Sequence, residues 1–248
     1  MPNRLSDSWL VQTANAELKK VLPRRAMVWL KRNVEARLVS RDLTRLAQIY
    51  GSDKWHKGYP ALYERHLGAR RRDVSTVLEI GVGAGPDPNR GGASLRMWRD
   101  YFPLARVYGI DIFKKSIQES RIVVLQGSQS DRSLMSHVAK QLGPIDLLID
   151  DGSHLQEDIR TSFEVLFPYV APGGFYVIED VHTAYWQKYG GSAPGAPDTA
   201  IALIKQLLDG IHHTYFQKLN YSPTYADLHI LAIHAYETIM FIEKRRPS

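Results

Sequence analysis

Two pairs of adjacent acidic residues end apolar stretches of this 248-residue sequence. Asp150 and Asp151 end the stretch "IDLLIDD", and Glu179 and Asp180 end "GFYVIED". Adjacent carboxylates repel each other, so a buried strand that ends in two of them needs a cation or a proton nearby. The sequence contains no cysteine, which leaves oxygen and imidazole as ligands. The fitting ion is therefore Mg²⁺, with Mn²⁺ or Ca²⁺ as substitutes.

A histidine follows the first acid pair at a spacing that suits proton transfer. His154 lies three residues after Asp151, and an imidazole titrates near neutral pH, so it can accept a proton from a weakly acidic hydroxyl group. The structural alternative for "DGSH" is a turn in which Ser153 caps a helix that begins near Leu155. A cap does not explain the second acid pair, so the combination favours a catalytic site.

A glycine turn follows the first predicted strand, in "VLEIGVGAG". Gly81 and Gly83 alternate after Glu79, where doubly wound folds bind adenosine-containing ligands. The dinucleotide fingerprint requires glycine at position 86, which is proline, and the next helix begins only at about Ala93. A pyrophosphate would then lack a helix N-terminus against the turn. The turn therefore favours a nucleoside without phosphates, and the absence of a Walker lysine motif argues against ATP.

The end of the next predicted strand narrows the choice of ligand. Asp111, in "GIDI", is placed to accept hydrogen bonds from both ribose hydroxyls. Dinucleotides share this need, but the glycine turn does not fit them. Together with the strand-end acids downstream, Asp111 favours S-adenosylmethionine as the cofactor.

Short β-branched runs alternate with helical stretches from residue 74 onward, which predicts an α/β fold: a doubly wound, Rossmann-like, mostly parallel sheet. The last residues, 227–244, contain two β-rich runs joined at "AYE", which predict an antiparallel pair at the C-terminus. The carboxyl ends of parallel strands line the ligand crevice, so both acid pairs should meet there. The expected strands are 76–81, 105–112, 121–127, 145–150 and 174–180, and the expected helices are 92–102, 131–142, 155–167 and 198–219.

Residues 1–48 show helical spacing of apolar residues, so we expect a helical extension for oligomerisation or as a lid, followed by one catalytic domain at 49–248. The net charge of +6 is not arranged as a basic stripe with aromatics, which argues against nucleic acid. The sequence has neither a spanning apolar run nor a signal-peptide core, so we expect a cytoplasmic protein without stable membrane insertion. The extension favours a homodimer or a higher assembly.

An ordered set of motifs resembles the magnesium-dependent sugar O-methyltransferases, which include macrolide-sugar enzymes. The likeness covers about residues 45–245, and its most specific part is "DDGSH" together with "VIED". Members of the family often carry a second histidine where this chain has Asp158. The motifs are "GSDK", "LEIGVG", "GGASLRMWRDYFP", "GIDI", "DDGSH", "LFPYVAPGGFYVIED" and "TAYW".

The resemblance implies a class I methyltransferase fold, S-adenosylmethionine as cofactor, one divalent metal and a sugar hydroxyl as acceptor. It also implies that Asp151, Glu179 and Asp180 bind the metal. Asp150, on the opposite side of its strand, is expected to position the cofactor or the strand end. His154 remains the predicted general base.

The remaining site residues are predicted from their place along the chain. In "LQGSQSD", Ser128 and Gln129 are expected to bond the adenine ring, beside a plain helix cap as the alternative. Tyr59, Tyr63 and His182 are expected near the acceptor, since aromatic rings suit sugar faces, with packing or a solvated loop as the alternative. The expected cofactor residues are thus Glu79, Gly81, Gly83, Asp111, Ser128, Gln129 and Asp150.

The predicted function is Mg²⁺-dependent methylation of a sugar hydroxyl. The first acceptor we consider is an oligosaccharide, such as a mannoside of an actinobacterial polymethylated polysaccharide, and the alternative is a deoxysugar on a macrolide-type natural product. Two other classes remain open. A metal-dependent hydrolase would not need the glycine turn with Asp111, and a non-catalytic nucleoside-binding protein would not need the acids.

Overall fold

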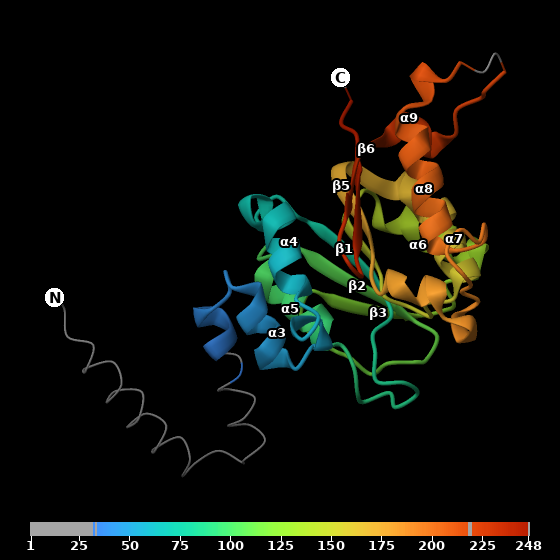
Figure 1. The fold of residues 1–248 in the computed structure, drawn as a ribbon. Coiled ribbons are helices and arrows are strands. Elements are labelled where there is room, and N and C mark those ends of the chain that lie inside the picture. Colours follow the sequence, from blue (N-terminus) through green and yellow to red (C-terminus); the bar gives the residue numbers. More distant parts are fainter. Residues whose placement is uncertain (1–31, 33, 218–219, 248) are drawn as a thin grey trace, which may run out of the picture.

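The computed structural model of the protein describes residues 32, 34–217 and 220–247. Its strands form one seven-stranded sheet (Figure 1). The strands are β1 (Thr76–Ile80), β2 (Arg106–Asp111), β3 (Ile122–Gln126), β4 (Ile145–Asp150), β5 (Val170–Ile178), β6 (Ile230–Ala235) and β7 (Met240–Lys244). The α-helices are α3 (Leu43–Tyr50), α4 (Tyr59–Leu67), α5 (Ala93–Tyr101), α6 (Arg132–Leu142), α7 (Gln156–Leu166), α8 (Ala200–Ile211) and α9 (Tyr225–His229).

The order of the strands places the predicted site residues on neighbouring strands. The order is β3-β2-β1-β4-β5-β7-β6, with β1 to β5 parallel and β7 antiparallel to both β5 and β6. Strands β1, β4 and β5 are in register at their carboxyl ends, where Ile80 pairs with Asp150 and Asp150 pairs with Ile178. The residues that follow these strands therefore meet at one edge of the sheet.

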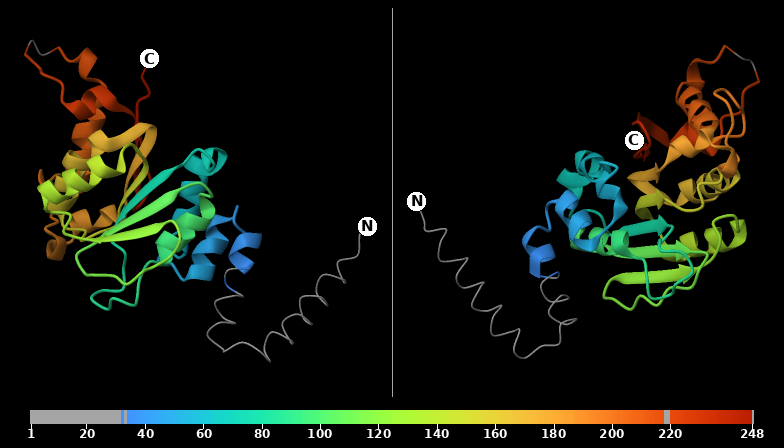
Figure 2. Two further views of the ribbon diagram at one scale, coloured as in Figure 1. Left: turned by 180° about the vertical axis from the view of Figure 1, so that it is seen from behind. Right: turned by 60° about the horizontal axis from the view of Figure 1, so that its bottom comes forward.

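Helices cover both faces of the sheet (Figures 1 and 2). One face packs against α3, α4 and α5 through residues such as Val77, Ile149 and Val177. The other packs against α6, α7 and α8 through Leu78 and Leu148. Successive residues of a strand point to opposite faces, so each β-branched or leucine-rich run supplies both cores at once.

The predicted α/β fold with its antiparallel C-terminal pair is confirmed, with two differences in element bounds. Strand β5 begins at Val170 and not at Gly174, because a register shift opposite Ile145 keeps "VAPG" in the sheet. The helix expected at 198–219 ends at Ile211, and a short 3-10 turn follows it. In both places glycine, proline or polar residues made the end of the element hard to predict from the sequence.

Most of the predicted helical extension lies outside the described residues. Residues 34–38 are helical, and α3 then crosses the expected boundary at 48. Helix α3 buries Leu43, Leu46 and Ala47 in the same core as α5, so its packing joins it to the helices on that face of the sheet. Among the described residues, no helix has the length and apolar character needed to cross a membrane. Assembly and compartment stay predictions.

Candidate active site

Three carboxylates point to the same face of the sheet at its carboxyl edge. Glu79, Asp151 and Glu179 continue the alternation of Val77, Ile149 and Val177, which places them on the α3–α5 face. Glu79 and Glu179 are fully buried, and the Asp151 side chain is 19% exposed. A buried group of this kind needs a compensating cation.

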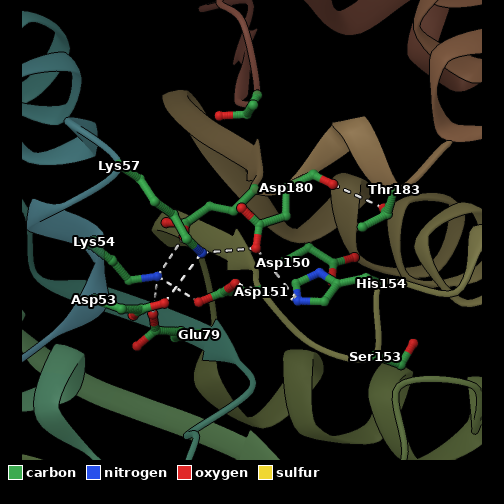
Figure 3. Close-up of polar contacts among 12 residues, drawn as sticks. Asp53, Lys54, Lys57, Glu79, Asp150, Asp151, Ser153, His154, Asp180 and Thr183 are labelled. Atoms are coloured by element: carbon green, nitrogen blue, oxygen red, sulfur yellow. Dashed lines mark hydrogen bonds and ion pairs between the residues drawn. The ribbon is translucent and has the colours of Figure 1, made fainter. Parts of the chain in front are cut away.

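Lys54 supplies that compensating charge from the loop between α3 and α4. Its Nζ atom lies 2.6 Å from Glu179 Oε2, 2.7 Å from Asp151 Oδ2 and 3.1 Å from Glu79 Oε1 (Figure 3). Burial alone would lower the pKa of Lys54, but the three carboxylates raise it well above its ordinary value. Lys54 is therefore a permanently charged centre of this group. Tyr63 completes the group by donating a hydrogen bond of 2.7 Å to Glu179 Oε1.

A second group opens beside the first and includes the predicted base. Asp151, His154 and Asp180 each present one ligand atom within 4.8 Å of the others. His154 Nε2 lies 3.7 Å from Asp180 Oδ2 and 3.9 Å from Asp151 Oδ1. His154 and Asp180 both have left-handed backbones, with φ of 59° and 53°. Such conformations cost about 1–3 kcal/mol each and concentrate at functional sites.

Asp180 is held in place by the same loop that carries Lys54. Lys57 Nζ donates to Asp180 Oδ2 over 2.8 Å, and the Tyr59 hydroxyl donates to Oδ1 over 2.8 Å. Partial burial alone would raise the pKa of Asp180, but the hydrogen bonds from Lys57 and Tyr59 lower it. Asp180 therefore stays ionised at neutral pH.

Asp150 lies on the opposite face, as expected, and has neutral partners. It accepts hydrogen bonds from Gln129 Nε2 at 3.1 Å, Ser162 Oγ at 2.5 Å and the Tyr176 hydroxyl at 3.3 Å. Burial raises the pKa of Asp150 to about 6, although these hydrogen bonds oppose the shift. Asp150 thus fixes the end of β4 to α7 and to the loop after β3.

Two cavities meet at the strand ends. One, of about 570 Å³, is lined by the glycine turn, Asp111 and Ser128. The other, of about 670 Å³, is lined by Lys57, His154 and Asp180. Gly81 and Asp151 line both. A Cβ atom on Gly81 would lie 2.0 Å from the Asp151 carbonyl oxygen, so only glycine allows this approach.

The glycine-turn cavity contains most of the predicted cofactor residues. Asp111 accepts hydrogen bonds from the backbone amides of Val82 (2.9 Å) and Phe113 (2.8 Å), which fixes its carboxylate at the cavity wall. Glu79 lies deeper, where Ser94 Oγ donates a hydrogen bond of 2.7 Å to it and Lys54 links it to Asp151 and Glu179. Glu79 therefore lies behind the glycine turn and does not line the cavity.

Several predicted residues have other contacts than expected. The Gln129 amide is used by Asp150 and by the Ser153 backbone amide, so it is not free for an adenine ring. Tyr59 and Tyr63 are 1% and 0% exposed, so their rings cannot stack on a sugar. Their hydroxyls hold the acids instead.

His182 also lies away from the open acid group. Its ring packs against Trp186 with centroids 4.7 Å apart, and its Nδ1 has no hydrogen-bond partner within the described part of the chain. Asp158, which replaces a frequent histidine of the family, accepts a hydrogen bond of 2.7 Å from Ser153 Oγ. It therefore positions the "DGSH" turn.

Lys54 and Lys57 were not predicted from the sequence. A metal was expected to neutralise the acids, whereas Lys54 supplies part of the compensating charge. The available signal was the motif "GSDKWHK", whose two lysines lie three residues apart within a polar segment that carries aromatic residues.

The residues present fit a divalent cation and an adenosine-type cofactor. Carboxylate oxygens of Asp151 and Asp180 converge beside a cavity, and such oxygens are hard donors suited to Mg²⁺ or Mn²⁺, while the His154 imidazole lies next to them. The glycine turn, Asp111 and Asp151 line one cavity together. The fold thus brings both halves of the expected site together.

A model of a methyltransferase-domain family matches residues 30–181. The chain belongs to this methyltransferase family. It is 44% identical to the demethylmacrocin O-methyltransferase of Streptomyces fradiae over 209 residues, which are 82% of this chain and 53% of that protein. It is 44% identical to the mycinamicin VI 2''-O-methyltransferase of Micromonospora griseorubida over 214 residues, 83% of this chain and 53% of that one. The chain thus spans about half the length of these relatives.

A third relative aligns with nearly the whole of this chain. The 8-demethyl-8-(2-methoxy-alpha-L-rhamnosyl)-tetracenomycin-C 3'-O-methyltransferase of Streptomyces olivaceus is 41% identical over 251 residues, 98% of this chain and 64% of that protein. Among solved structures, the MycE methyltransferase of the mycinamycin pathway, in complex with Mg and SAH, matches with a TM-score of 0.79 and 43% identity over 83% of this chain and 55% of that one. The predicted resemblance and the class I methyltransferase fold are confirmed.

Proposed function

We propose that the protein transfers a methyl group from S-adenosylmethionine to a hydroxyl group of a sugar, with Mg²⁺ bound by its acidic residues. The observation that carries the proposal is the shared wall of Gly81 and Asp151 between the two cavities. This wall brings a nucleoside-type cavity next to an open group of acids and a histidine. The likeness to MycE, whose structure contains Mg and SAH, supports the same pairing of ligands here.

In this proposal Asp111 binds the ribose and the glycine turn accommodates the rest of the cofactor beside Asp151. Asp151 and Asp180 would hold Mg²⁺, with Glu179 behind them. When bound, Mg²⁺ lowers the pKa of a coordinated hydroxyl and fixes its direction. Lys54 holds the buried acids in place, although burial raises the pKa of Glu79 and raises that of Glu179 to about 8.

His154 is the proposed general base. Its Nε2 faces the open group, and the carboxylates of Asp151 and Asp180, at 3.9 and 3.7 Å, favour the protonated imidazole that forms. The acceptor oxygen attacks the methyl carbon in line with the sulfonium sulfur. A carbon–oxygen bond forms, the carbon–sulfur bond breaks with its electron pair left on sulfur, and the hydroxyl proton goes to His154.

The acceptor we propose is a sugar carried by a larger molecule. The relatives are named for macrolide and tetracenomycin glycosides, which favours a sugar on a polyketide-type aglycone over the oligosaccharide or mannoside considered first. A metal-dependent hydrolase remains the weaker candidate, because it would leave the cavity at Asp111 without a purpose.

Methyl transfer from labelled S-adenosylmethionine to a panel of glycosides and free sugars, with Mg²⁺ or with a chelator, tests the proposal. We expect label on a glycoside only when Mg²⁺ is present. Label on none of the sugars, together with tight binding of S-adenosylhomocysteine, would keep the cofactor and reject the acceptor. Label that is insensitive to the chelator would reject the metal.

A further inference from the structure

Two lysines of one loop contact the acids, and they differ in how firmly they are held. Lys54 is 1% exposed and contacts three carboxylates at 3.1 Å or less. The Lys57 side chain is 30% exposed and contacts Asp180 on the side of the open cavity. An ammonium group buried among three acids cannot leave without stranding them, whereas a partly exposed one can.

Lys57 occupies an oxygen that a cation would need. Asp180 Oδ1 already accepts the Tyr59 hydroxyl, and Oδ2 accepts Lys57 at 2.8 Å. Oδ2 is also the oxygen nearest to His154 Nε2, so it is the one that faces the open group. A divalent cation bound to that oxygen would be placed close to the ammonium of Lys57, and like charges at such separation repel strongly.

A second acid is already within reach of Lys57. Asp53 Oδ2 lies 3.2 Å from Lys57 Nζ, one helical turn earlier in the same loop, and the Asp53 side chain is 70% exposed (Figure 3). Rotation of the Lys57 side chain toward Asp53 would keep an ion pair while it frees Asp180. The loop thus offers Lys57 a partner, Asp53, when it leaves Asp180.

We propose that Lys57 is a displaceable counter-ion, which neutralises Asp180 in the metal-free protein and gives up Asp180 for its contact with Asp53 when a divalent cation binds Asp151 and Asp180. The inference rests on the proposed metal site. Lys57 is a positioning residue in this account: it sets the affinity for the cation and keeps Asp180 in its left-handed conformation until the cation arrives.

The test measures the affinity for divalent cations in the presence of S-adenosylhomocysteine. Mn²⁺ binding is measured by the loss of the free-ion signal in electron paramagnetic resonance, and Mg²⁺ binding is measured by calorimetry. Lys57→Met removes the competitor, so we expect Mn²⁺ to bind about 5-fold or more tightly than to the native protein. Lys57→Arg keeps the charge and should bind Mn²⁺ no more tightly than the native protein. Asp53→Asn removes the alternative partner and should weaken Mn²⁺ binding by a smaller factor.

A matched control changes the same charge elsewhere. Lys205→Met alters an exposed lysine of α8, a helix that supplies no lining residue to the two cavities within the described chain, and should leave Mn²⁺ affinity unchanged. Equal or weaker Mn²⁺ binding by folded Lys57→Met would overturn the counter-ion role alone. Failure of both the native protein and Lys57→Met to bind any divalent cation would overturn the metal site itself. Thermal unfolding without metal adds a second readout, since Lys57→Met should melt earlier than Lys205→Met.

Discussion

At the carboxyl ends of the central strands, the two faces of the sheet neutralise their acids by different means. On the α3–α5 face, Lys54 lies among Glu79, Asp151 and Glu179 as a buried cation. On the α6–α8 face, Asp150 accepts hydrogen bonds only from neutral donors among the described residues. Acids held by ammonium groups can exchange one cation for another, whereas an acid held by neutral groups in a core fixes the end of its strand.

Asp150, the last residue of β4, and Asp151, which follows it, thus have different roles. Asp151 faces the lysines and both cavities, while Asp150 faces α7 and is 2% exposed. Successive side chains of a strand point to opposite faces of the sheet, and this alone separates Asp150 from Asp151. The proposed chemistry therefore lies on one face of the sheet, and variants on each face test this difference.

The largest expected effect belongs to the proposed base. His154→Gln keeps a polar side chain but removes the proposed proton acceptor, so turnover should fall about 10²- to 10⁴-fold. Binding of S-adenosylhomocysteine should stay near native, as measured by calorimetry. His212→Gln, at an exposed histidine beyond α8, serves as the control. Native-like turnover of His154→Gln would reduce His154 to a residue that shapes the turn before α7.

Lys54→Met should cost the most stability. The variant leaves three carboxylates without their cation, and breaking a buried ion pair on one side typically costs about 3–5 kcal/mol. Urea unfolding in the presence of a chelator measures the free energy of unfolding. Lys205→Met, an exposed change of the same charge, should stay within about 0.5 kcal/mol of native. A loss below about 1 kcal/mol for Lys54→Met would mean that the acids are protonated and not ion-paired.

The smallest effect tests the face with neutral donors. Burial raises the pKa of Asp150 to about 6, so the folded state binds its proton more tightly than the unfolded state does. The resulting stability is present at low pH and is lost as pH rises through about 6. In metal-free protein, the free energy of unfolding of the native chain relative to Asp150→Asn should fall by about 1 kcal/mol between pH 5 and pH 7. An opposite slope would place a cation beside Asp150.

The fold and the two acid pairs were predictable because they depend on local patterns. Short β-branched runs mark the strands, and the ends of parallel strands share one edge, so Asp151 and Asp180 could be placed together from the sequence. The glycine turn and Asp111 follow the same rule at the neighbouring strands. None of these inferences needs knowledge of how distant loops pack.

The lysines could not be placed in the same way. Lys54 contacts Asp151 across 97 positions and Glu179 across 125, and Lys57 contacts Asp180 across 123. These contacts exist because the loop between α3 and α4 folds over the edge of the sheet, which no local pattern reports. For the same reason, Tyr59 and Tyr63 looked like sugar-facing rings, although packing turns their hydroxyls toward the acids.

Crystals grown with S-adenosylhomocysteine and Mn²⁺ would test the account most directly, through the anomalous scattering of manganese. The account predicts one peak at coordination distance, roughly 2.0–2.3 Å, from carboxylate oxygens of Asp151 and Asp180. It also predicts Lys54 in place among its three acids and the Lys57 ammonium moved to Asp53. A peak elsewhere, or S-adenosylhomocysteine bound at Asp111 with no manganese at the acids, would contradict it.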